Sequence, residues 1–316
     1  MKLSHCLLLL ILILSPKVAT SQTPKSAEDY NNRGVTRRSH GDVDGAIEDF
    51  TKAISLKGKP IIIATAYNNR ANALLSKDDI EGALADYSKA IELDPTNYEN
   101  YYNRGIVLAS NNKLDLAIAD FSKVIQMVPN FWLAYNNRGN AFSAKGDYDT
   151  AIADYTTAIK YNPKSSDALY NRGIAFQTKK ELDNALRDYS AAIALSPDFF
   201  LAYINRAVVL QAKNDFAGAI ADYTKALQFK ADDAGVFYGR GLVKQQTKDL
   251  SGAFADYSKA IELDPTLASA YANRGVIEML ENKTTDAQRD FDKAFKLDPS
   301  LEPSYREFID KRRKRP

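Results

Sequence analysis

The sequence is poor in the side chains that carry most nucleophilic and metal-dependent catalysis. Among 316 residues there is one cysteine, Cys6, and there are two histidines, His5 and His40. One cysteine excludes a disulfide within the chain, and a single histidine beyond the N-terminal segment excludes a two-histidine metal site. The chain also lacks a P-loop and a G-x-G-x-x-G motif. We therefore predict a protein that is not an enzyme and has no catalytic residues, metal site or cofactor.

An excess of charge of one sign is also missing. The chain has 42 basic and 40 acidic side chains, which gives a formal net charge of +2. Without residues 1–21, which contain Lys2 and Lys17 but no acid, the two signs balance. Because nucleic-acid-binding proteins usually carry a marked basic excess, we expect no nucleic-acid partner. The basic cluster at residues 311–315 is expected to be a solvated chain end or, alternatively, to touch anionic surfaces.

Long hydrophobic runs are absent as well. The longest apolar run extends from residue 6 to residue 14, whereas a helix that spans a bilayer needs about 20 residues. Lys2 precedes this run, and the small residues Ala19-Thr20-Ser21 follow it, as in a cleavable secretory signal peptide. We therefore expect an exported protein, either periplasmic, on the cell surface or secreted, with no stable membrane insertion. The alternative is an uncleaved signal that tethers the chain to a membrane.

The rest of the chain consists of a repeated unit. Two motifs, Tyr-x-Asn-Arg-Gly and Ala-[Ile/Leu]-x-Asp-[Tyr/Phe], recur together with few changes. The small residue that ends the first motif is Gly34, Ala71, Gly105, Gly139, Gly173, Ala207, Gly241 and Gly275. The alanine of the second motif is Ala46, Ala83, Ala117, Ala151, Ala185, Ala219, Ala253 and Ala287. After a first interval of 37 residues, every interval is 34.

The spacing within each unit predicts two helices joined by a tight turn. The aromatic and small residues of the first motif lie four apart, as do the alanine and the aromatic residue of the second, so each pair shares one helical face. Residues that tolerate a left-handed backbone stand between the motifs at Gly41, Asn112, Gly146, Asn214 and Asn282. Acids suited to cap the second helix are Asp42, Asp79, Asp147, Asp215 and Asp249.

This 34-residue pattern resembles that of the tetratricopeptide repeat (TPR) family. The resemblance covers about residues 27–301 and implies an all-α, right-handed superhelical solenoid of eight helix-turn-helix repeats with a C-terminal capping helix. The expected parts are a signal peptide at 1–21, repeats at about 27–60, 64–97, 98–131, 132–165, 166–199, 200–233, 234–267 and 268–301, and a capping helix with a basic tail at 302–316. Tyr305, Phe308 and Ile309 supply the apolar stripe of the capping helix.

The asparagine of the first motif forms a ladder of candidate binding residues. Its members are Asn32, Asn69, Asn103, Asn137, Asn171, Asn205 and Asn273, interrupted by Gly239. In families of this fold the first helices line the concave surface, and a similar ladder in the sugar-transferring enzymes of protein O-glycosylation grips the backbone of extended peptides. The resemblance implies a peptide-binding groove here, since an amide offers a donor and an acceptor to any peptide group. The alternative is that these amides bridge neighbouring repeats, and one asparagine can do both.

An arginine and an aspartate recur at constant offsets in all eight units. The arginines are Arg33, Arg70, Arg104, Arg138, Arg172, Arg206, Arg240 and Arg274, and the aspartates are Asp49, Asp86, Asp120, Asp154, Asp188, Asp222, Asp256 and Asp290. Because a recognition code would vary between units, this constancy favours ion pairs that set the repeat geometry. Contact with a ligand is the minor alternative.

Positions that differ between units are better candidates for ligand specificity. They include Tyr102, Tyr170, Tyr238, Phe131 and Trp132. Most of these rings are expected to pack between repeats. Trp132 is the only tryptophan, and we include it among the candidate binding residues.

We therefore predict a scaffold or adaptor that binds a protein or peptide in a concave groove outside the cytoplasm. Two alternatives are a structural assembly spacer without a saturable peptide ligand and an accessory subunit of an enzyme. The sequence has no room for a second domain beyond the repeats, which argues against the enzyme alternative.

Overall fold

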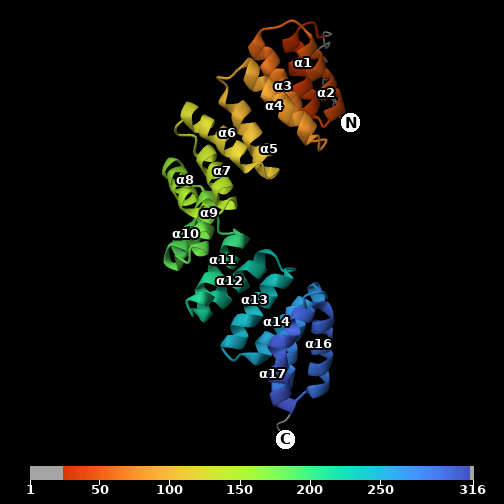
Figure 1. Cartoon of the computed structure of the whole chain (residues 1–316), viewed down its shortest axis with the longest axis vertical. Coiled ribbons are helices and arrows are strands. Elements are labelled where there is room, and N and C mark those ends of the chain that lie inside the picture. The colour runs from red at the N-terminus through yellow and green to blue at the C-terminus, as the bar shows by residue number, and fades with distance from the viewer. Residues whose placement is uncertain (1–23, 314–316) are drawn as a thin grey trace, which may run out of the picture. The chain divides into compact units, whose positions relative to one another are not determined.

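The computed structural model describes residues 24–313. The signal peptide predicted at residues 1–21 lies outside the described residues, as does the end of the basic tail. Within the described range the chain forms 17 α-helices and one short 3-10 helix, with no β-strand (Figure 1). The prediction of an all-α helical-repeat solenoid with a C-terminal capping helix is confirmed.

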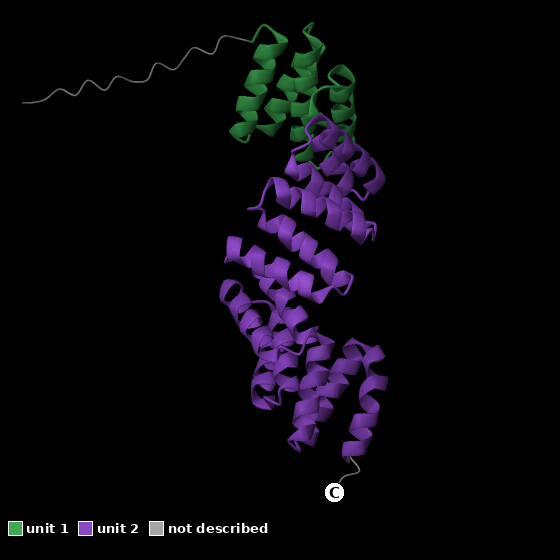
Figure 2. Cartoon of the chain, turned by 90° about the vertical axis from the view of Figure 1, so that its left-hand side faces the viewer, with its two compact units in different colours: residues 1–100 green, residues 101–316 purple. Residues whose placement is uncertain are grey.

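The helices are α1 (Ala27–Ser39), α2 (Val43–Ser55), α3 (Pro60–Leu75), α4 (Ile80–Leu93), α5 (Tyr98–Ser110), α6 (Leu114–Met127), α7 (Trp132–Ala144), α8 (Tyr148–Tyr161), α9 (Ser166–Thr178), α10 (Leu182–Leu195), α11 (Phe200–Ala212), α12 (Phe216–Phe229), α13 (Ala234–Gln246), α14 (Leu250–Leu263), α15 (Ala268–Leu280), α16 (Thr284–Leu297), η1 (Pro299–Leu301) and α17 (Glu302–Arg313). Odd-numbered helices up to α15 are the first helices of the repeats, and even-numbered helices are the second helices. The chain divides into two compact units, unit 1 up to Asn100 and unit 2 from Tyr101 onward (Figure 2).

The turn between the two helices of a repeat has the same backbone conformation throughout. Positive φ angles occur at Gly41, Asp78, Asn112, Gly146, Lys180, Asn214, Lys248 and Asn282. The sequence predicted the glycine and asparagine members of this set but not the other three. A lysine or aspartate in this conformation costs about 1 kcal/mol, which the packing of the two helices offsets. The five predicted aspartate caps each accept a backbone N–H of the following helix.

Small residues on the first helix leave space for the ring of the second helix. A Cβ atom built on Gly139 would lie 2.7 Å from Cε1 of Tyr155, and one on Gly173 would lie 2.7 Å from Cε1 of Tyr189. A glycine therefore allows the ring to lie against the backbone of the first helix, and burial of that ring is a major stabilising contribution.

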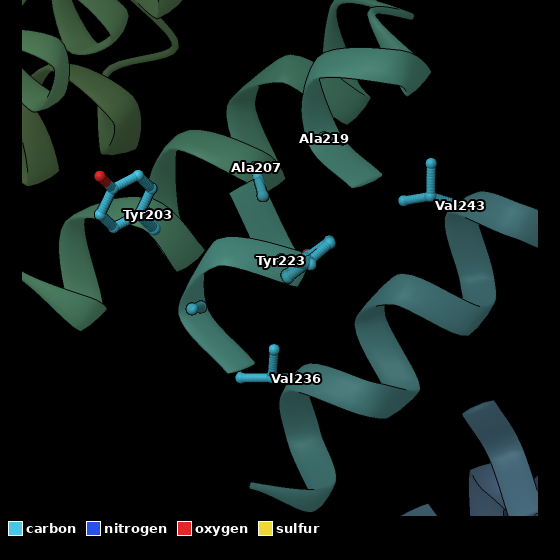
Figure 3. Close-up of a cluster of buried hydrophobic side chains, with 7 residues drawn as sticks. Tyr203, Ala207, Ala219, Tyr223, Val236 and Val243 are labelled. Atoms are coloured by element: carbon cyan, nitrogen blue, oxygen red, sulfur yellow. The ribbon is translucent and has the colours of Figure 1, made fainter. Parts of the chain in front are cut away.

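The core extends from each repeat to the next. In one cluster Tyr203 and Ala207 of α11 and Ala219 and Tyr223 of α12 lie near Val236 and Val243 of α13, which opens the following repeat (Figure 3). Each repeat thus buries one of its faces only because a neighbour covers it.

The capping helix α17 covers the last repeat of unit 2. Its Ile309 is buried with Met279 and Phe291, and Tyr305 and Phe308 pack against this cluster. The Tyr305 hydroxyl also donates to Oδ1 of Asn273 at 2.9 Å. The predicted apolar stripe therefore lies against the solenoid.

The first helices form the inner side of the stack in unit 2. Here α7 contacts α9, α9 contacts α11 and α11 contacts α13, whereas second helices of neighbouring repeats make no comparable contact in the described residues. Closer spacing on one side means that the stack curves toward that side. We call the solvent-facing part of the first helices of unit 2 the inner surface.

Candidate binding surface

The ladder asparagines lie on consecutive first helices and bridge neighbouring repeats. Nδ2 of Asn137 donates to the hydroxyl of Tyr102 at 3.1 Å, and Nδ2 of Asn205 donates to the hydroxyl of Tyr170 at 2.9 Å. The same bond joins Asn69 to Asn31 at 2.9 Å, Asn171 to Asn136 at 3.3 Å and Asn273 to Tyr238 at 3.1 Å. In each case the acceptor belongs to the preceding repeat. The bridging role that the sequence left open is therefore present.

The break in the ladder coincides with the loss of the acceptor. The acceptor row of the preceding repeat holds Ile204 where the five repeats before it hold tyrosine or asparagine, and the ladder residue that follows it is Gly239. A Cβ on Gly239 would also come within 3.0 Å of the Tyr223 ring. An asparagine at this position would thus lack the acceptor in the preceding repeat and would press on the Tyr223 ring.

The remaining candidate residues occupy different surroundings. Asn32 is exposed in the first repeat, which has no preceding repeat to bridge to, and Asn103 is half-buried on α5. Trp132 is half-buried at the start of α7. It lies four and eight residues before Asn136 and Asn140, so the three share one helical stripe.

At Asn171 and Asn205, bridging uses only half of the ladder amide. In residues 24–312 no side chain donates to Oδ1 of Asn171 or Asn205, and both residues are half-buried. A carbonyl oxygen can accept two hydrogen bonds. These two ladder residues of unit 2 therefore combine a structural N–H group with an oxygen that can accept a bond from a ligand.

The variable tyrosines of the first helices are inter-repeat residues. The rings of Tyr102 and Phe131 meet edge to face with centroids 5.1 Å apart, and those of Tyr170 and Phe199 lie 4.8 Å apart. Burial raises the pKa of Tyr102 and Tyr170 above the ordinary value, so both phenols stay protonated at neutral pH. Their main contribution is to pack between repeats and to accept the ladder bonds.

A second set of amides on the first helices receives bonds from the second helices. The hydroxyl of Tyr155 donates to Oδ1 of Asn140 at 2.8 Å, that of Tyr189 donates to Oε1 of Gln177 at 2.5 Å, and that of Tyr257 donates to Oε1 of Gln245 at 2.6 Å. These pairs were not predicted from the sequence. The signal was present as a correlation: tyrosine occupies the second-helix position where the first helix offers an amide.

The predicted arginine–aspartate pairs are present in every repeat and are bidentate. In the fourth repeat Nε and Nη2 of Arg138 donate to Oδ2 and Oδ1 of Asp154 at 2.7 and 2.8 Å. The aspartates are buried, and hydrogen bonding to Asp154 raises the pKa of Arg138. These pairs join the two helices of a repeat, consistent with the structural interpretation.

Six of these arginines also reach the preceding repeat, a contact that was not predicted from the sequence. The remaining guanidinium nitrogen, Nη1, donates to a serine or threonine hydroxyl on the preceding second helix. These pairs are Arg70–Thr51, Arg138–Ser122, Arg172–Thr156, Arg206–Ser190, Arg240–Thr224 and Arg274–Ser258, at 3.0 to 3.3 Å. One arginine therefore fixes both the geometry of its own repeat and the stacking on its neighbour.

Exposed lysines form a further contact between repeats. Lys77 lies 3.0 Å from Asp44, Lys179 lies 2.5 Å from Asp149 and Lys213 lies 2.6 Å from Asp183. The partners belong to adjacent repeats within one unit. Because these pairs are open to water, each contributes at most about 1 kcal/mol.

The last repeat contains a carboxylate in a position that five other repeats fill with apolar residues and two fill with Arg37 and Lys244. Glu278 of α15 is 7% exposed, and its Oε2 has no hydrogen-bond partner. The corresponding residues in other repeats include Leu74, Leu108 and Leu210. Burial raises the pKa of Glu278 to about 7, and the charge of nearby Asp290 adds to this effect.

Neither a metal site nor a membrane span emerges from the described residues. Residues 24–313 contain no group of three or more His, Cys, Asp or Glu residues that could hold a metal ion. No helix in this range combines the length and the apolarity that crossing a membrane requires.

Helix pairs with this packing define a helical-repeat protein, and comparisons with known proteins identify the family. Models described as TPR or tetratricopeptide repeat match residues 64–97, 87–119, 121–153, 139–180, 166–199, 201–233 and 234–267. The chain therefore belongs to the tetratricopeptide repeat family. A search of curated proteins finds no match.

Solved structures with the same fold include bacterial repeat proteins. A tetratricopeptide repeat protein from Parabacteroides merdae is 20% identical in sequence. The match covers 84% of this chain and 100% of that protein, with a TM-score of 0.60. The C-terminal part of a TPR repeat-containing protein from Cytophaga hutchinsonii is 21% identical, with coverages of 77% and 98% and a TM-score of 0.63. YrrB, described as a TPR protein with an unusual peptide-binding site, is 22% identical, with coverages of 58% and 95% and a TM-score of 0.52.

Proposed function

We propose that this chain is a non-catalytic scaffold that binds a peptide segment or a partner protein on the inner surface. The observation that carries the proposal is the row of ladder amides whose nitrogens are used between repeats while oxygens such as Oδ1 of Asn171 and Asn205 remain able to accept a ligand N–H. The peptide-binding site in the name of YrrB, a protein of the same fold, adds support.

We also propose that the protein acts outside the cytoplasm. The support is the N-terminal segment with Lys2, the apolar run at residues 6–14 and the small residues up to Ser21. The native protein is then expected to begin near residue 22 and to fractionate with the envelope or the medium. Intact-mass measurement of the native protein tests this. A full-length mass would mean that the segment is retained as a tether or does not direct export.

The ladder's two roles can be separated by substituting each end of the same hydrogen bond. We expect the triple variant Asn137→Ala, Asn171→Ala, Asn205→Ala to bind ligand at least about tenfold more weakly, because each lost hydrogen bond contributes about 1 kcal/mol. The matched control Tyr102→Phe, Tyr170→Phe removes two bridging acceptors but keeps every ladder amide. It is expected to lower stability while retaining binding.

Binding can be measured by selecting ligands from an arrayed random-peptide library and then titrating each variant with the selected peptides. The fluorescence of Trp132, the only tryptophan, supplies an independent readout at the start of α7. If the asparagine variant loses stability but binds every selected peptide as the wild type does, the ladder is only a bridge between repeats. If the wild type selects no peptide, the chain is a spacer and the proposed function is wrong.

A further inference from the structure

Buried tyrosines of the second helices fix the orientation of amides on the inner surface. Because the hydroxyls of Tyr155, Tyr189 and Tyr257 donate to the amide oxygens, those oxygens point toward the second helices. The planar amide must then turn its NH2 group the other way. In residues 24–312 these three nitrogens have no hydrogen-bond partner, and Asn140 is exposed while Gln177 and Gln245 are half-buried.

The choice between tyrosine and phenylalanine at the second-helix position shows that the hydroxyl is not there to fill space. Phe121 and Tyr189 are both fully buried, so either ring packs there. In the repeat of Phe121, the residues that correspond to Asn140 and Gln177 are Ile106 and Ala109. Three of the four tyrosines at this position in unit 2 donate to an amide, which indicates that their hydroxyls serve to hold it.

Three positions on each first helix near these amides carry no charge in this part of the chain. In the six repeats from Gly105 onward, the residues one, four and five places after the small residue include no acidic or basic side chain, although 26% of the whole chain is charged. Ile106 and Val208, at 41% and 39% exposure, stand in this strip. A charged segment would lose its hydration there without gaining an ion pair, so the strip favours an uncharged segment.

Two kinds of polar group thus lie side by side on the first helices. The ladder leaves oxygens of Asn171 and Asn205 as acceptors, and the tyrosine-held amides of Asn140, Gln177 and Gln245 supply donors. An extended polypeptide has both C=O and N–H groups along its length and can bond to both rows. A neutral glycan would also need aromatic rings to stack on, but the tyrosines of the inner surface are packed between repeats.

We propose that Asn140, Gln177 and Gln245 form a donor row that binds backbone carbonyls of an uncharged, extended polypeptide segment, and that Tyr155, Tyr189 and Tyr257 are positioning residues for this row. The proposal rests on the proposed function and specifies the class of ligand. The donor row recognises the backbone of the ligand and the absence of charge on its side chains, so many different uncharged side chains are tolerated.

The test removes the three hydroxyls without removing the amides. The probe is a labelled peptide of about 12 residues built from Ser, Thr, Val and Gly, which spans about 40 Å when extended, and its binding to the purified full chain is followed by fluorescence anisotropy. We expect the variant Tyr155→Phe, Tyr189→Phe, Tyr257→Phe to bind it about tenfold more weakly. Tyr223→Phe is the control, since the Tyr223 hydroxyl donates to no amide in the described residues. A probe with Lys or Glu at every third position is expected to bind at least about tenfold more weakly to the wild type.

The possible results distinguish a failure of the inference from a failure of the proposed function. Equal binding of the neutral probe by the triple variant and the wild type would overturn the inference, as would equal binding of neutral and charged probes. Either leaves the proposed function standing, provided that some peptide binds. If only a neutral oligosaccharide binds, or if no peptide binds, both are wrong. Circular dichroism of the triple variant shows whether the helices are retained. If the triple variant does not fold, the double variant Gln177→Leu, Gln245→Leu removes two of the donors directly.

Discussion

Replacing Arg172 by methionine is expected to destabilise the fifth repeat by about 3 to 5 kcal/mol, because it leaves a buried carboxylate without a partner. Nε and Nη2 of Arg172 donate to Asp188 at 2.7 and 2.8 Å, and the Asp188 side chain is only 4% exposed. The third guanidinium nitrogen also loses its bond to Thr156 at 3.0 Å. Hydrogen exchange of α9 and α10, together with the urea midpoint, measures the loss.

A control in the same repeat distinguishes burial from charge. Lys179→Met removes an exposed lysine whose partner Asp149 is 82% exposed, so its cost should stay below about 1 kcal/mol. Adding Asp188→Leu to Arg172→Met should restore much of the lost stability, because no charge is then left buried. If Arg172→Met lowers the stability no more than Lys179→Met does, the Arg172–Asp188 pair is not a major stabilising element.

Replacing Glu278 by leucine is expected to stabilise the last repeat by about 1 to 3 kcal/mol at pH 8. The pKa of Glu278 is raised from 4.5 to about 7, so the folded state binds its proton more tightly than the unfolded state does. Its contribution to stability is therefore present below about pH 4.5 and is lost as the pH rises toward 7. The variant should gain much less at pH 5 than at pH 8.

Hydrogen exchange of α15 to α17 at the two pH values measures this difference. The other charged groups that act on Glu278 are Asp290 and Asp286, which raise its pKa, and Arg274 and Lys283, which lower it. Glu281→Gln, which removes an exposed acid beside the same turn, is the control and should change the pH dependence little. A wild type and a Glu278→Leu variant with the same pH profile would show that Glu278 does not titrate in this range.

The period and the intra-repeat pairs could be predicted from the sequence. The 34-residue spacing determines which residues share a helical face, and a charge pair kept at one offset, such as Arg138 with Asp154, needs only the hairpin geometry of one repeat. The caps and the apolar stripe of α17 follow from local rules in the same way.

The polar contacts between repeats could not be predicted in this way. The bond from Asn137 to Tyr102 depends on how closely two first helices of different repeats approach, and the orientation of Gln177 depends on a hydroxyl that arrives from another helix. The sequence identified the ladder but could not show that its nitrogens and oxygens have different surroundings. The positive φ angles of Asp78, Lys180 and Lys248 are imposed by tertiary packing, against the local preference of those residues.

The three recurrent polar contacts between repeats give the stack a direction. The ladder amide, the arginine Nη1 and the exposed lysine of a repeat all donate to acceptors on the repeat before it. During synthesis, each emerging repeat therefore brings donors to a repeat that already displays the matching acceptors. The polar contacts of the solenoid can close one repeat at a time in the order of translation, and no repeat needs to wait for the C-terminus to be made.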